Sequence, residues 1–94
     1  MTPERRCTPR YSVAVEIQVN NGTGVTSNFS SSGVYFETAE PLMPNEHVSI
    51  VFPFDHAAPG ARASCSAHVR RVDRLAERYG VAASYDTVSF DVRP

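Results

Sequence analysis

The chain lacks lysine entirely, contains only two cysteines and has no long apolar run. Its nine basic residues are all arginines, and ten acidic residues give a formal net charge of −1 at pH 7. A general nucleic-acid surface needs an excess of basic charge, so this balance argues against DNA or RNA as a partner. The two cysteines, Cys7 and Cys65, are far apart in the chain, and we expect them to be reduced rather than paired in a disulfide.

Targeting and membrane signals are also absent. No segment approaches the roughly 20 apolar residues of a transmembrane helix, so membrane insertion is not expected. The first residues, Met-Thr-Pro-Glu-Arg-Arg, contain no apolar stretch of the kind found in a signal peptide. The cytoplasm is therefore the expected location. The length of 94 residues suits a single domain with a modest core.

The signals of catalysis and of metal binding are missing as well. Residues 30–32 are three serines in a row, but no Gly-x-Ser-x-Gly elbow surrounds a serine nucleophile. The three histidines, His47, His56 and His68, show no short ligand spacing with one another or with the cysteines. We therefore expect a protein that is not an enzyme and that holds no metal and no cofactor.

What the chain does contain is a repeated alternation of apolar and polar residues, which indicates half-buried strands. Residues 12–19 alternate strictly, and Asn20-Asn21-Gly22 then signals a tight hairpin turn. Leu42, in a link with two prolines, is a candidate for plugging the core. The pattern predicts an all-β domain of about six strands, a small antiparallel barrel or sandwich. The later strands are expected near residues 23–29, 34–37, 48–54, 62–72 and 79–85, the fifth strand with a bulge near Arg70-Arg71.

Residues 1–11 contain two prolines and show no periodicity, so they form an arm before the first strand. Three of the arginines, Arg5, Arg6 and Arg10, are clustered in this arm beside a single acidic residue. Such a cluster is either a local anion-binding site or a solvated basic tail. The end of the chain is short and mixed, and it forms either one helical turn or a frayed tail. The chain thus divides into three parts: an arm (1–11), a barrel (12–86) and a C-terminal tail (87–94).

A polar turn, Asn28-Phe29-Ser30-Ser31-Ser32-Gly33, separates two of the apolar runs. Gly33 either supplies a positive φ or lets another backbone or a ligand approach closely. Asn28 and Ser30 offer side-chain hydrogen-bonding groups beside the turn, although Ser30 could equally stabilise the turn itself. Arginine is suited to phosphate and to the edge of guanine, because its planar fork donates two parallel hydrogen bonds. Two arginines four apart, followed by this turn, are typical of phosphate and base recognition.

Arg6-x-x-x-Arg10 followed by Asn28-x-Ser30-x-x-Gly33 resembles the pattern of the PilZ domain family, bacterial receptors for the second messenger cyclic di-GMP. The family pattern is RxxxR, then Asp or Asn, any residue, Ser, two further residues and Gly. Every defining position is matched here. The resemblance continues to the strand at Tyr79-Gly80-Val81 and therefore covers nearly the whole chain. It implies a six-stranded antiparallel β-barrel of the split-barrel type. Because the arginine-rich arm, residues 1–11, has few apolar anchors, we expect it to be flexible.

The resemblance also implies a ligand site. The two arginines of RxxxR would contact phosphates and the O6 and N7 acceptors of guanine. Asn28 would accept from the guanine N1–H and N2–H₂ groups, with one acceptor oxygen where an Asp has two. Gly33 is expected to serve conformation more than contact. The candidate ligand-binding residues are Arg5, Arg6, Arg10, Asn28, Ser30 and Gly33.

The expected function is that of a non-enzymatic cyclic di-GMP receptor, which signals to an unidentified downstream protein when the ligand binds. One alternative is a PilZ-like adaptor that keeps the barrel and binds no nucleotide, and another is an unrelated small barrel with a chance match. The two complete motifs favour the receptor, because an adaptor would have little reason to retain both.

Overall fold

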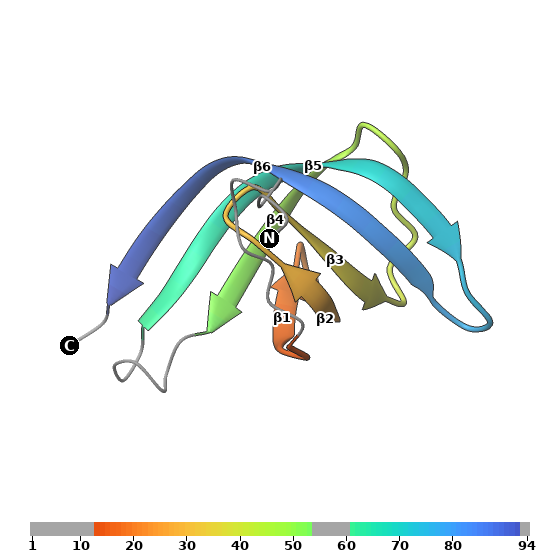
Figure 1. Cartoon of the computed structure of the whole chain (residues 1–94), viewed down its shortest axis with the longest axis horizontal. Helices are drawn as coiled ribbons and strands as arrows, with labels where there is room; N and C mark the ends of the chain where they lie inside the picture. The colour runs from red at the N-terminus through yellow and green to blue at the C-terminus, as the bar shows by residue number, and fades with distance from the viewer. Residues whose placement is uncertain (1–12, 54–60, 93–94) are drawn as a thin grey trace, which may run out of the picture.

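The computed structural model describes residues 13–53 and 61–92 of the chain. In these residues six strands close into one antiparallel barrel with the order β1-β2-β3-β6-β5-β4 (Figure 1). The expected all-β, six-stranded antiparallel barrel is confirmed, whereas the arginine-rich arm lies outside the described residues. This part of the chain contains no helix with the length and apolar character needed to span a bilayer. The strands are β1 (Glu16–Val19), β2 (Gly22–Phe29), β3 (Gly33–Thr38), β4 (His47–Pro53), β5 (Ala61–Arg74) and β6 (Tyr79–Val92).

The two longest strands, β5 and β6, have 14 residues each and form a long arch over the shorter strands (Figure 1). Their pairing shifts register between Val69 and Arg71, which makes Arg70 the extra residue of a β-bulge. This is the bulge expected near Arg70-Arg71, where the alternation of apolar residues changes parity. A bulge bends the strand that contains it, which suits a strand that curves around a small barrel.

The C-terminal residues are part of the barrel. Residues 87–92 continue β6 and pair with the first half of β5, as in the pair formed by Cys65 and Val88. The chain end up to Val92 is therefore neither the helical turn nor the frayed tail considered from the sequence. Its local pattern is too short to specify a strand, and the partner strand β5 supplies the backbone hydrogen bonds that make it one.

The first strand begins later than its alternation predicts. The expected strand covered residues 12–19, but β1 starts at Glu16, and Val13 is 51% exposed. The residues before β1 are tied to β2 by Thr26, whose hydroxyl accepts a hydrogen bond from the Val15 amide at 2.9 Å and donates one to the Val13 carbonyl. The Thr26 side chain, which is almost fully buried, thus replaces part of the backbone hydrogen bonding between this segment and β2.

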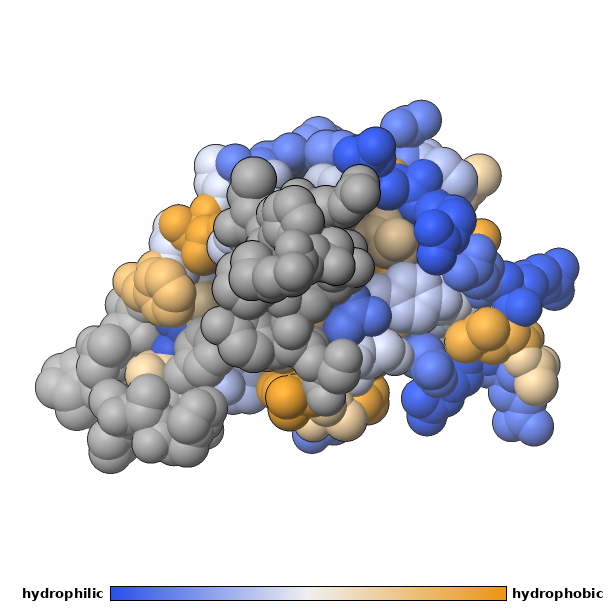
Figure 2. All heavy atoms as spheres, viewed as in Figure 1, coloured by the Kyte–Doolittle hydropathy of each residue, from blue (hydrophilic) through white to orange (hydrophobic). Residues whose placement is uncertain are grey.

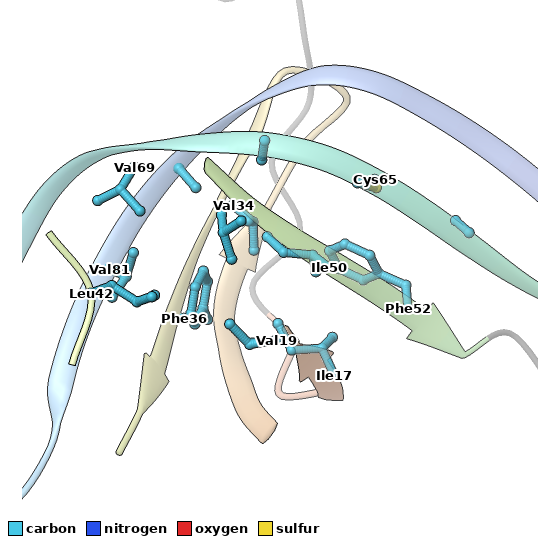
Figure 3. Close-up of a cluster of buried hydrophobic side chains, with 14 residues drawn as sticks. Ile17, Val19, Val34, Phe36, Leu42, Ile50, Phe52, Cys65, Val69 and Val81 are labelled. Atoms are coloured by element: carbon cyan, nitrogen blue, oxygen red, sulfur yellow. The ribbon is translucent and has the colours of Figure 1, made fainter. Parts of the chain in front are cut away.

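The core lies on the concave side of the arch formed by β5 and β6 (Figure 3). The expected inward face of β4 is confirmed: Ile50 has no exposed surface, and Val48 and Phe52 are 3% exposed. Leu42, from the link with two prolines, is buried in the core cluster as predicted. The buried cluster consists of Ile17, Val19, Val34, Phe36, Leu42, Val48, Ile50, Phe52, Ala63, Cys65, Ala67, Val69, Val81 and Ala83.

Candidate functional site

A groove of about 700 Å³ opens beside the turn between β2 and β3. The turn and β3 form one side of it, and the bulge of β5 forms the other, with β6 between them. Its volume falls within the range of about 300–1,000 Å³ that is usual for small-molecule sites. Asn28, Ser30 and Gly33, the three candidate ligand residues that the structure describes, all line this groove. Its other lining residues are Ser32, Val34, Tyr35, Arg70, Arg71, Ala82, Ala83 and Ser84.

Ser30 holds the turn in its shape. Its backbone amide donates to the Gly33 carbonyl at 2.9 Å, and its hydroxyl oxygen accepts from the Ser32 amide at 3.2 Å. The Ser32 carbonyl in turn accepts a hydrogen bond from the Tyr85 amide, which fastens the turn to β6. The turn-stabilising role considered for Ser30 is therefore present. Contact between its hydroxyl and a ligand stays a prediction.

Gly33 is needed because another backbone comes close to it. A Cβ at this position would lie 2.6 Å from the carbonyl oxygen of Ala83 on β6, and the φ of Gly33 is outside the left-handed region. Of the two reasons considered for this glycine, close approach is the one that applies. The absence of a side chain lets β3 and β6 pair at the edge of the groove.

Asn28 lies where the pairing of β2 with β3 shifts register, between Thr26 and Asn28. It is paired with Tyr35 of β3, and both residues line the groove. The remaining candidates, Arg5, Arg6 and Arg10, lie outside the described residues. Their assignment to the ligand stays a prediction.

Three groove residues, Tyr35, Arg70 and Arg71, were not identified from the sequence. Arg71 lies against the Tyr35 ring, with its guanidinium carbon 5.8 Å from the ring centroid. The Nε of Arg71 donates to Asp73 Oδ1 at 3.1 Å, and the Tyr35 hydroxyl donates to Asp73 Oδ2 at 3.0 Å. Arg70 Nη1 donates to the Ser84 hydroxyl at 3.2 Å. The predicted bulge was the available signal, because bulges redirect the side chains around them.

The charges of this network are well defined. The hydrogen bond from Arg71, followed by that from Tyr35, lowers the pKa of Asp73, so its carboxyl stays ionised. Burial, followed by the hydrogen bond to Asp73, raises the pKa of Tyr35, which keeps its hydroxyl protonated. Around neutral pH Arg71 is thus partly neutralised by Asp73, whereas none of the ion pairs among the described residues involves Arg70. Hydrophilic side chains gather where β5 and β6 run toward their hairpin (Figure 2).

The PilZ domain family matches residues 4–91 of this chain. The chain belongs to the PilZ domain family, and the match includes both the arginine motif and the turn that lines the groove. Among solved structures, it is similar to the inhibitor of motility from Bacillus subtilis (MotI/DgrA), with a TM-score of 0.78 and 16% sequence identity. The similarity covers 93% of this chain and 45% of that chain, and at this identity it shows the fold. A search of curated proteins found no match.

Proposed function

We propose that this protein is a non-enzymatic receptor for cyclic di-GMP that signals to a partner protein. The observation that supports this most directly is the groove in which Asn28, Ser30 and Gly33 meet, in a chain of the PilZ family. We place this receptor in the cytoplasm, with cyclic di-GMP and a downstream protein as its partners. It requires no cofactor, does not insert into a membrane and does not bind DNA or RNA.

The chemistry of the groove suits the ligand. Cyclic di-GMP has two phosphates and two guanines, so a receptor must supply cations and groups that read a guanine edge. The Asn28 side chain can accept from the guanine N1–H and N2–H₂ donors, and the Ser30 hydroxyl can donate to a phosphate oxygen. Arg6 and Arg10 supply the fork-shaped donors for phosphate and for O6 and N7 of guanine.

The point at which the chain after the arm is tied to the barrel supports counting the arm's arginines among the ligand-binding residues. Val13 and Val15 are tied to Thr26 of β2, two residues before Asn28. Arg10 precedes Val13 by three residues, which an extended chain spans in about 10 Å. From this attachment point we expect Arg10 to reach a ligand in the groove.

The decisive experiment is a calorimetric titration of the whole protein with cyclic di-GMP. We expect binding, and we expect Arg10→Ala to weaken it more than tenfold, because a charge-assisted hydrogen bond contributes about 1.5–3 kcal/mol. Arg74→Ala is a matched control, since Arg74 is exposed on β5 and does not line the groove. Wild-type protein that shows no heat at high micromolar nucleotide would contradict the proposed receptor function. The alternative function, an adaptor that binds no nucleotide, would then be favoured.

A second experiment tests how the signal arises. We expect the ligand to order the arm across the barrel, because its phosphates offset the entropy of ordering a segment with few apolar anchors. Amides of residues 1–11 should then exchange more slowly with cyclic di-GMP than without it, and affinity should fall as salt rises. Equal protection in both states would mean a preformed site and would exclude this switch.

A further inference from the structure

The β5 side of the groove presents two neighbouring arginines, Arg70 and Arg71, whose surroundings differ. Neither belongs to the two sequence motifs. Both project from the bulge of β5, where the register of the β5–β6 pairing shifts. The strand order places β3 and β6 between this bulge and the Asn28–Gly33 turn, so the two arginines face a ligand from the far side of the groove.

Arg71 is held in one orientation by its neighbours. Its Nε and Nη2 donate to the Asp73 carboxylate at 3.1 and 3.2 Å, and its guanidinium lies against the Tyr35 ring. Tyr35 is itself fixed, by its hydrogen bond to Asp73 and by its position over Gly80, where a Cβ would collide with the Tyr35 hydroxyl. The Arg71 side chain nevertheless remains 64% exposed. A fixed and exposed guanidinium plane is a surface on which a nucleobase can stack.

Arg70 has a different set of contacts. It is exposed, and its Nη1 donates to the hydroxyl of Ser84 on β6 at 3.2 Å. Among the described residues no carboxylate forms an ion pair with it. An anion that enters the groove can therefore bind Arg70 without first displacing an acidic side chain of residues 13–53 or 61–92. A charge-assisted hydrogen bond to phosphate is the interaction that Arg favours.

We propose that these two arginines form a subsite with divided roles, in which Arg71 stacks on a guanine base of the ligand and Arg70 pairs with one of its phosphates. This inference rests on the proposed function and adds the β5 wall to the groove's ligand-binding residues. The Tyr35–Asp73 pair acts as a positioning element, because it sets the plane of the Arg71 guanidinium.

The two roles are separated by comparing alanine with lysine at each position in titrations with cyclic di-GMP. Lysine keeps the charge of arginine but has no planar group. We therefore expect Arg71→Lys to lose most of the affinity that Arg71→Ala loses. At the other position we expect Arg70→Ala to lose about tenfold, the equivalent of one charge-assisted hydrogen bond, and Arg70→Lys to bind within about threefold of wild type. The Arg70→Ala variant should also depend less on salt.

Arg74→Ala serves as the control here too, and far-ultraviolet circular dichroism establishes that each variant is folded. Arg70→Ala and Arg71→Ala proteins that bind as tightly as wild type would overturn the subsite while the receptor function stands. Arg71→Lys with wild-type affinity would overturn the stacking role. Wild-type protein that fails to bind cyclic di-GMP would overturn the proposed function and this inference with it.

Discussion

Replacing Gly33 with alanine should destabilise the barrel at the edge of the groove. The new Cβ would lie 2.6 Å from the Ala83 carbonyl oxygen, and the next nearest atoms, the Ala83 carbonyl carbon and the Ser84 Cα, are also backbone. No side chain can rotate away to relieve this contact. Relief requires β6 to move away from β3, but Gly33 is paired with Ser84, and its carbonyl accepts from the Ser30 amide.

The magnitude follows from the type of contact. Forcing an extra carbon into a packed site costs about 1–3 kcal/mol, and here the displaced atoms belong to a paired strand. For a domain of this size each kcal/mol lowers Tm by about 4–8 °C, so we expect a decrease on the order of 5–20 °C. A Gly→Ala change also stiffens the unfolded chain, which stabilises the protein by about 0.4–1 kcal/mol and offsets part of the effect.

Gly22→Ala is the matched control for this experiment. The three atoms nearest to its Cβ all belong to the Glu40 side chain, which is flexible and can turn away. Because the effect of alanine on the unfolded chain is the same at both positions, the difference between the two variants isolates the clash with β6. The free energy of unfolding is measured by urea denaturation followed by circular dichroism. A Gly33→Ala protein as stable as Gly22→Ala would refute the argument from close approach.

Three further predictions concern the core. Ile50→Asp should unfold the domain, because an unpaired charge would be buried at a position with no exposed surface. The control Glu16→Gln, on the exposed face of β1, should leave the domain folded. A folded Ile50→Asp protein would show that the core is misassigned. Thr26→Val should lower the free energy of unfolding by about 1–3 kcal/mol, because the Val15 amide loses its acceptor, and an unchanged urea midpoint would contradict this. Burial raises the pKa of the Cys65 thiol, so in a Cys7→Ser background it should resist alkylation until the protein unfolds, and fast labelling of native protein would exclude this. Because the folded pKa lies above the usual 9.0, the thiol's contribution to stability is complete below pH 9.0 and is lost as the pH rises through the folded value.

Much of the barrel was predictable because a strand repeats every two residues, and that repeat is visible in a short window. The alternation of Val48, Ile50 and Phe52 identified β4 and its inward face. The hairpin after β1 was also predictable, because Asn20-Asn21-Gly22 is a local turn signal. In the structure, Asn20 adopts the positive φ of 53° that a tight turn of this kind requires. The change of parity along the fifth strand located its bulge at Arg70.

The motif Asn28-x-Ser30-x-x-Gly33 located the side of the groove that the turn between β2 and β3 forms. Asn28, Ser30 and Gly33 belong to one turn, so their proximity in the groove follows from their proximity in the chain. The inward face of β2 was not predictable in this way. Val25 is 37% exposed while Thr26 is buried, because Gly24 and Thr26 face the interior and the Thr26 hydroxyl satisfies the backbone before β1. Hydropathy alone would favour the opposite arrangement.

The amino-acid sequence by itself determined the alternating part of each strand, the hairpin turn after β1 and the residues of the polar turn, because each of these depends on neighbours in the chain. Only the tertiary structure decided that residues 87–92 form a strand and that Arg70 and Arg71 face the turn across β6. Both outcomes depend on which strands become neighbours, in the order β3-β6-β5. That order is set by the packing of the whole core, since backbone hydrogen bonds can form between any two extended segments and do not specify a partner.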